Sequence, residues 1–246
     1  MSTTAPTSVD ALPAPVDPRP MGLASRVVNV LFAPRQAYEA VVARPQIVGV
    51  LVLVIAIIAT AQFVFLSTEV GQNALLDQQL GYLKAFNVNI TDAMVQQMES
   101  RMATARYTTA GSLVVFVPLM IAIMSGLLLA IFTVISGSGA NFKQMYAIVA
   151  HSYVIGAVQQ MFSLPINYIR GEMTSPTSMA VFFPMLDDQG FAHYLLGAID
   201  LFYLWSIFNV AVGVAVLYKR RTGGVAAVLF GIYAVIAIAI ASWRAL

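Results

Sequence analysis

Residues 47–66 read IVGVLVLVIAIIATAQFVFL, an apolar run in which no side chain is charged. At a rise of about 1.5 Å per residue, a helix of this length covers about 30 Å, the thickness of the hydrocarbon core of a bilayer. Stretches of the same kind follow at residues 112–135, 147–169, 194–218 and 225–243. The runs are continuous rather than alternating, which favours helices over the strands of a β-barrel. We therefore predict an all-α fold, a polytopic membrane bundle of five transmembrane helices.

The composition of the chain agrees with a membrane protein. Of its 246 residues, 59% are hydrophobic and 10% are charged, and the mean hydropathy is +0.81. So few charges cannot cover the surface of a water-soluble domain. The 13 Lys and Arg against 11 Asp and Glu give a net charge of +2, too small and scattered for a nucleic-acid partner. The chain has no cysteine, which excludes thiolate metal sites and cysteine nucleophiles.

The segments outside the apolar runs predict a tail, short interfacial helices and an outer cap. Residues 1–21 are rich in proline and predict a disordered tail without the features of a signal peptide. Two short amphipathic helices, at 22–32 and 35–44, would lie on the inner leaflet with their arginines toward anionic headgroups, or pack under the bundle. Residues 67–111 predict a helical outer insert, in which Thr91 caps a second helix that runs into the next span. The outer loop at 170–193 is aromatic and is expected to dip against the bundle or the headgroups.

The distribution of basic residues predicts the orientation. With the N-terminus in the cytoplasm, the outer segments hold Lys84, Arg101, Arg106, Arg170 and Arg244. The inner segments then hold the larger set, namely Arg19, Arg26, Arg35, Arg44, Lys143, Lys219, Arg220 and Arg221. Basic residues collect on the cytoplasmic side of membrane proteins, and a short loop such as 219–221 weighs most. We predict a cytoplasmic N-terminus and an external C-terminus.

The third run, 147–169, is the most polar, because it contains His151, Gln159, Gln160, Pro165 and Asn167. A re-entrant or interfacial helix is an alternative to a full crossing. However, Ser152, Gly156, Gln159 and Ser163 share one helical face, as in a helix buried among partners.

Asp200 is the main candidate for a functional intramembrane residue, because it falls inside the fourth run. An ionised carboxylate in the bilayer must be protonated, wetted or partnered. His193, seven residues earlier, would share its helical face, and Asn209 would lie on another side of the same helix. Asp200 is therefore either a proton or cation site or, as we favour, a hydrogen-bonded clasp that holds the fourth span against the outer cap.

Small residues predict the faces on which helices pack, since helices in lipid associate through close backbone approach. The stripes include Gly126 between Ala122 and Ala130, Gly156 in the third run, Gly213 in the fourth, and Gly231 after Ala227 in the fifth. They could pack within one chain or between chains.

Five separate stretches resemble the Yip family, the five-span membrane proteins of the Ypt/Rab-interacting type. They are Phe32-Ala33-Pro34-Arg35-Gln36-Ala37-Tyr38-Glu39, Arg44-Pro45, Asn141-Phe142-Lys143-Gln144, Ile199 to Ser206, and Lys219 to Gly223. The resemblance covers about residues 26–243, looks like the bacterial branch, and implies five spans with a cytoplasmic N-terminus. Eukaryotic members interact with Rab-type GTPases and with one another. A bacterial relative would lack such GTPases, so this partner is not expected.

Motifs of catalysis are missing from the sequence. The two histidines, His151 and His193, form no zinc-binding helix motif, and no phosphate-binding glycine loop ending in Lys-Ser/Thr occurs. We expect no catalytic residue, no metal and no cofactor. The leading hypothesis is a scaffold or recruitment protein of the bacterial inner membrane, with the bilayer and a protein or a second copy as partners. A small oligomeric transporter or channel built on Asp200 and His193 is the alternative, and a membrane-embedded enzyme is a third possibility.

Overall fold

The computed structural model describes residues 21–86, 88–137, 139–187 and 190–245. The predicted tail therefore lies almost wholly outside the described residues. The helices are α1 (Leu23–Phe32), α2 (Pro34–Ala43), α3 (Val48–Leu66), α4 (Glu69–Ala85), α5 (Asp92–Ser136), α6 (Phe142–Arg170), α7 (Phe191–Ala198), α8 (Leu201–Leu217) and α9 (Thr222–Arg244), with a 3₁₀ turn η1 (Met179–Phe182). Within the described ranges, the prediction of an all-α bundle is confirmed.

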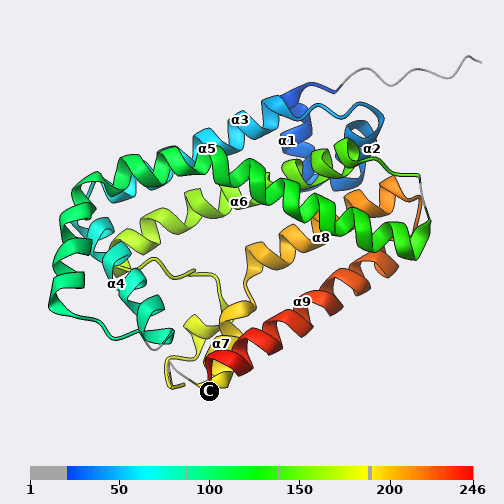
Figure 1. The fold of residues 1–246 in the computed structure, drawn as a ribbon. Coiled ribbons are helices and arrows are strands. Elements are labelled where there is room, and N and C mark those ends of the chain that lie inside the picture. The colour runs from blue at the N-terminus through cyan, green and yellow to red at the C-terminus, as the bar shows by residue number, and fades with distance from the viewer. Residues whose placement is uncertain (1–20, 87, 138, 188–189, 246) are drawn as a thin grey trace, which may run out of the picture.

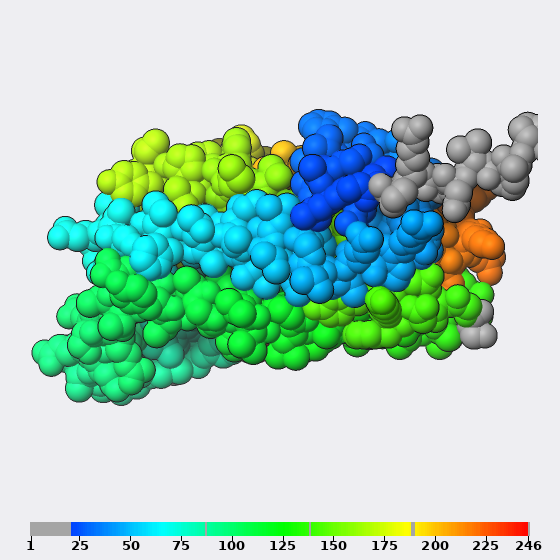
Figure 2. All heavy atoms as spheres, turned by 90° about the horizontal axis from the view of Figure 1, so that it is seen from above, coloured from blue at the N-terminus to red at the C-terminus, as the bar shows by residue number. Residues whose placement is uncertain are grey.

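The long helices run side by side and the short ones gather at the two ends of the bundle (Figure 1). One end holds α1, α2 and the connections α5–α6 and α8–α9, and we call it the α1–α2 end. The opposite end holds α4 and α7, and we call it the α4–α7 end. The described chain begins at the α1–α2 end, whereas its C-terminal residues lie at the α4–α7 end. Figure 2 shows α3 between α5 and α6 on one face of the bundle.

Among the described residues, four helices are long and apolar enough to cross a membrane, namely α3, α5, α6 and α9. The fifth long member of the bundle, α8, has 17 residues and thus covers about 25 Å, slightly less than a hydrocarbon core. In α6, 56% of the most apolar window is buried inside the protein, against 17–22% in α3, α5 and α9. α6 is therefore the central helix, and the other three turn most of their apolar surface outward, toward the lipid.

α6 is one continuous helix from Phe142 to Arg170. Asn141 and Gln144 form a capping box at its start, and Gly171 ends it in a left-handed conformation with φ of 64°. Pro165 lies inside the helix and does not end it. An unbroken helix of 29 residues favours a full crossing over the re-entrant alternative.

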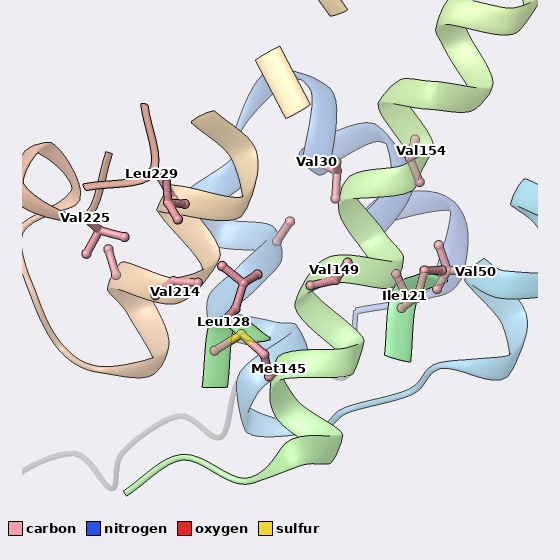
Figure 3. Close-up of a cluster of buried hydrophobic side chains, with 14 of the residues drawn as sticks. Val30, Val50, Ile121, Leu128, Met145, Val149, Val154, Val214, Val225 and Leu229 are labelled. Atoms are coloured by element: carbon pink, nitrogen blue, oxygen red, sulfur yellow. The ribbon is translucent and has the colours of Figure 1, made fainter. Parts of the chain in front are cut away.

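The main hydrophobic core lies toward the α1–α2 end, where α1, α2, α3, α5, α6, α8 and α9 contribute buried side chains (Figure 3). Those labelled in Figure 3 are Val30, Val50, Ile121, Leu128, Met145, Val149, Val154, Val214, Val225 and Leu229. α1 joins this core through Val30, and α2 packs on α8 and α6 through Tyr38 and Val41. The structure therefore favours the second alternative for these short helices, which pack under the bundle.

The outer insert contains two helices, as its sequence pattern predicts. Thr68 caps α4 by accepting a hydrogen bond from Gly71 N at 3.0 Å, and Thr91 caps α5 by accepting one from Met94 N at 3.4 Å. α5 then continues without interruption to Ser136, and its Met102 and Ala105 are buried. Phe86, the residue after α4, contacts Trp243 in the last turn of α9, and their ring centroids are 5.4 Å apart.

The fourth apolar run is not one helix, which corrects the predicted span at 194–218. The chain leaves α7 after Ala198, is extended at Ile199 and Asp200, and begins α8 at Leu201. The break occurs because the Asp200 carboxylate accepts hydrogen bonds from the amides of Phe202 and Tyr203, which makes Asp200 the N-cap of α8. Asp200 is thus at a helix start and not in the interior of a span.

The four candidate packing glycines differ in their surroundings. A Cβ atom on Gly213 would lie 2.3 Å from Cγ2 of Ile148 and 3.1 Å from Cδ1 of Tyr38. Gly213 therefore allows α8 to approach α6 and α2 closely. A Cβ atom on Gly126, Gly156 or Gly231 would meet no described atom within 4 Å, apart from its own chain neighbours and helix backbone.

The contrast predicts opposite effects of adding a methyl group. We expect Gly213→Ala to lower the free energy of unfolding by about 1–3 kcal/mol, because Ile148 and Tyr38 must move. We expect Gly231→Ala to leave it unchanged or to raise it, since alanine favours the helix. Thermal unfolding of the two purified variants in the same detergent would measure the difference. Equal melting temperatures would contradict the close packing at Gly213.

Candidate functional site

The best-defined polar site surrounds Asp200, whose side chain is fully buried. Its Oδ1 accepts hydrogen bonds from the Phe202 amide at 2.9 Å, the Tyr203 amide at 3.2 Å and Gln159 Nε2 at 3.3 Å. Its Oδ2 accepts hydrogen bonds from the hydroxyls of Ser175 and of Thr177, the latter at 2.7 Å. We call the set of Asp200, Gln159, Ser175 and Thr177 the Asp200 clasp.

Backbone pairing accompanies the clasp. Ser178 and Asp200 form an isolated antiparallel bridge, in which Met179 N donates to Ile199 O at 2.8 Å and Leu201 N donates to Thr177 O at 3.4 Å. The hydroxyl of Tyr233 on α9 also donates to Ala198 O, the carbonyl at the end of α7. A helix break inside a bundle exposes backbone groups that need new partners. The loop between α6 and α7 supplies them, which confirms that this loop dips against the bundle.

The clasp differs in its partners from the one expected. We expected Asp200 to hold the fourth span against the outer cap, whereas its described partners come from α6 and from the α6–α7 loop. The expected pairing with His193 depended on a continuous helix between the two residues, and the break after Ala198 removes that geometric reason. His193 lies in the first turn of α7, with its ring 6.0 Å from that of Tyr194.

A second polar cluster joins α1 to α6 near the α1–α2 end. Arg26 is 5% exposed, and its guanidinium donates to Gln46 Oε1 at 2.8 Å and to Gln46 O at 3.3 Å. It also lies 3.4 Å from Nε2 of the fully buried His151. We call Arg26, Gln46 and His151 the Arg26 cluster. The prediction that Arg26 faces the headgroups is wrong, because its side chain points into the bundle, toward Gln46 and His151.

Hydrogen bonding fixes the protonation pattern of the Arg26 cluster. His151 Nδ1 is 2.7 Å from the carbonyl of Ala147, which can only accept, so Nδ1 carries a proton. Nε2 is then free to accept from Arg26, which can only donate. Burial lowers the pKa of Arg26, and an arginine remains charged nonetheless. A neutral His151 thus accepts from a buried cation that contacts no carboxylate among the described residues.

The remaining candidates are dispersed. Asn209 is fully buried on α8 and donates to Trp205 O at 3.3 Å, while its Oδ1 has no partner among the described atoms. Arg35 pairs with Glu39 at 3.1 Å on the surface of α2, and Lys219, Arg220 and Arg221 are exposed between α8 and α9. Arg44 is the residue that ends α2. Among the described residues, no group of three His, Asp or Glu side chains is arranged to hold a metal ion.

Sequence reasoning missed Ser175 and Thr177 as partners of Asp200, and Gln46 as a partner of Arg26. The three residues are small or neutral polar side chains in connecting segments, where such residues are common. Only the residues to which they bond, Asp200 and Arg26, stand out in the sequence, because they are charged residues in a mostly apolar chain. Polar residues in a loop that is expected to dip are the one feature that could have indicated Ser175 and Thr177 as partners of Asp200.

The comparisons with known proteins agree with this architecture. The family model described as the Yip1 domain matches residues 28–244, which span α1 to α9. No curated protein and no solved structure matches the chain. The match covers nearly all of the bundle, including both polar clusters apart from Arg26. The chain is therefore a multi-pass membrane protein that belongs to the Yip1 domain family.

Proposed function

We propose that this protein is a non-enzymatic scaffold or recruitment protein that organises its membrane through protein–protein contacts. The observation that carries the proposal is that hydrogen bonds from the chain itself occupy both oxygens of the Asp200 carboxylate. Five donors from the same chain bind its two oxygens. A transport site must exchange its ligands, whereas each donor to Asp200 also fixes the position of a loop or a helix. The clasp therefore supports a structural role for this acidic residue.

The faces left open by the bundle support contacts with other chains. Gly126 on α5 and Gly231 on α9 have room beside them, and the neighbouring Ala130 and Ala227 are exposed. Stripes of small residues allow a second helix to approach closely in lipid. A protein partner or a second copy could therefore bind along α5 or α9.

We propose five crossings, with α8 as the fifth. α8 covers about 25 Å, and the extended segment at 199–200 together with α7 completes the path to the α4–α7 end. The first and last described residues lie at opposite ends of the bundle, which supports an odd number of crossings (Figure 1). With the basic connection at Lys219–Arg221 inside, the N-terminus is cytoplasmic and the C-terminus external. The membrane that we propose is the bacterial inner membrane.

One observation favours the alternative, a small transporter. Gln62 Oε1 on α3, with Ser163 Oγ and Asn167 Oδ1 on α6, are buried without a described partner. Waters could satisfy such atoms and form a hydrated path between α3 and α6. In that case Asp200 would lie beside the path, through its contact with Gln159.

Replacement of Asp200 separates the two functions. In Asp200→Asn, the amide oxygen can still cap Phe202 and Tyr203, and the amide nitrogen can donate to the hydroxyls of Ser175 and Thr177. We expect this variant to lose about 1 kcal/mol or less, and Asp200→Ala to lose about 2–4 kcal/mol, because alanine leaves buried donors unpaired. Thermal unfolding in detergent measures both. A folded Asp200→Asn protein that loses a pH-dependent flux in vesicles would instead favour the transporter.

Site-specific photo-cross-linking tests the scaffold directly. A photoreactive residue at Ala130 or Ala227 should give a discrete adduct in native membranes, whereas the same residue at Val52, exposed on α3, should give none. Gly231→Leu should remove the adduct at Ala227 without lowering the melting temperature, since the leucine fills an open face. Adducts of equal yield at all three positions, or none at any, would count against the proposal.

Reporter fusions test the topology. A reporter active only in the cytoplasm should be active before Met1 and inactive after Leu246, because five crossings place the ends on opposite sides. Activity at both ends would mean an even number of crossings, and α8 would then not span the membrane.

A further inference from the structure

A cavity of about 430 Å³ opens at the α1–α2 end, where α2, α8 and α9 meet. Its walls are the first turn of α2 with the residue before it (33–36), Phe208 and Val212 on α8, and Thr222 at the start of α9. The walls are mostly apolar, and neither the start of α2 nor that of α9 carries a side-chain cap. The space is large enough for a polar headgroup with the beginning of an apolar chain.

One cationic side chain lines this cavity, and three more precede the residue of α9 in its wall. Arg35 lines it, and the pair with Glu39 uses only the Nε atom of the arginine. Within the described part of the chain, no hydrogen bond uses the two terminal nitrogens of Arg35, which leaves them for a ligand. Arg221 directly precedes Thr222, and Arg220 and Lys219 come before it in the connection. Residues 33–36 and 219–221 thus contain four cationic side chains and no carboxylate, and Glu39 on the next turn of α2 pairs with Arg35.

An apolar stripe leads away from the cavity along α8. Leu201, Trp205, Phe208 and Val212 follow at steps of four, three and four residues, so they share one helical face. Leu201 is 64% exposed, Phe208 is 44% exposed and Trp205 between them is half-buried, whereas Val212 is buried. The other helices therefore leave the stripe uncovered from Leu201 to Phe208. In a membrane, the acyl chains of a lipid would cover such a stripe.

We propose that this cavity binds an anionic glycerophospholipid from the leaflet at the α1–α2 end. The phosphate lies between Arg35 and the Lys219–Arg221 connection, and one acyl chain lies along the stripe from Phe208 to Leu201. Guanidinium groups suit a phosphate because they offer paired donors in one plane. The apolar walls and the stripe commit the site to a lipid rather than to a free phosphate, since a soluble anion would leave both uncovered. This inference does not depend on the proposed scaffold role.

Tryptophan fluorescence can test the site, because Trp205 lies on the stripe and the only other tryptophan is Trp243. Trp243→Phe leaves Trp205 as the single reporter and preserves the aromatic contact with Phe86. The variant is placed in vesicles of equal parts phosphatidylglycerol and phosphatidylcholine, with acyl-chain bromine on one lipid or the other. We expect stronger quenching when the phosphatidylglycerol carries the bromine. Equal quenching by the two lipids would overturn the proposal.

Charge removal identifies the residues that select the lipid. In the same background, Arg35→Ala with Arg221→Ala should reduce the preference for phosphatidylglycerol about fivefold for each arginine removed. Lys84→Ala with Arg101→Ala makes the same change in net charge on exposed residues of α4 and α5, and should leave the preference intact. An equal loss in both double variants would show a general charge effect and would refute the site.

A competition experiment distinguishes a lipid from a soluble anion. Glycerol phosphate at millimolar concentration should not reduce the preferential quenching, because it cannot occupy the stripe on α8. Full displacement would assign the cavity to soluble phosphate esters and would overturn the lipid assignment. Both arginines are exposed, so the variants are expected to fold, and their melting temperatures provide the control.

Discussion

The hydrocarbon core of a bilayer contains no water that could form hydrogen bonds with a free amide or carbonyl. This constraint determines the structure around Asp200. A break between α7 and α8 would leave backbone groups without partners. The carboxylate of Asp200 bonds two amides at the start of α8, while residues 177–179 pair with the extended segment beside it. The carboxylate also accepts hydrogen bonds from the side chains of Ser175, Thr177 and Gln159. The helix break, the α6–α7 loop and α6 therefore form one interdependent unit.

The central position of α6 explains why this helix is more polar than the other spans, because its polar side chains bond to the helices around it. His151, near one end, accepts from Arg26 and thereby attaches α1, whereas Gln159, two turns further on, donates to Asp200 and attaches α8. Polar side chains on this helix thus fix its neighbours at two levels of the bundle. Between them, Ile155 is fully buried. A helix with a less polar face would still cross the bilayer, but nothing directional would orient α1 and α8 around it.

Hydrophobicity and capping residues were sufficient to predict most of the helices. The run at 47–66 differs from α3 by one residue, and the cap expected at Thr91 predicted both the start of α5 and its continuation into the next span. The break at Asp200 could not be predicted, because the run at 194–218 contains no proline and its apolar pattern continues through the break. The partners of Asp200 come from a loop that only the tertiary fold brings near. The direction of Arg26 was missed for the same reason, since its acceptor on His151 is 125 residues away.

The two arginines of the short N-terminal helices show how burial divides one residue type between two roles. Arg26 on α1 is 5% exposed, and its guanidinium bonds to Gln46 and lies against His151 of α6. Arg35, one helix later, has a side chain that is 70% exposed and borders a cavity with free terminal nitrogens. The first arginine can therefore stabilise only the bundle itself. The second is free to bind, and the difference arises from the face of each helix on which the residue falls.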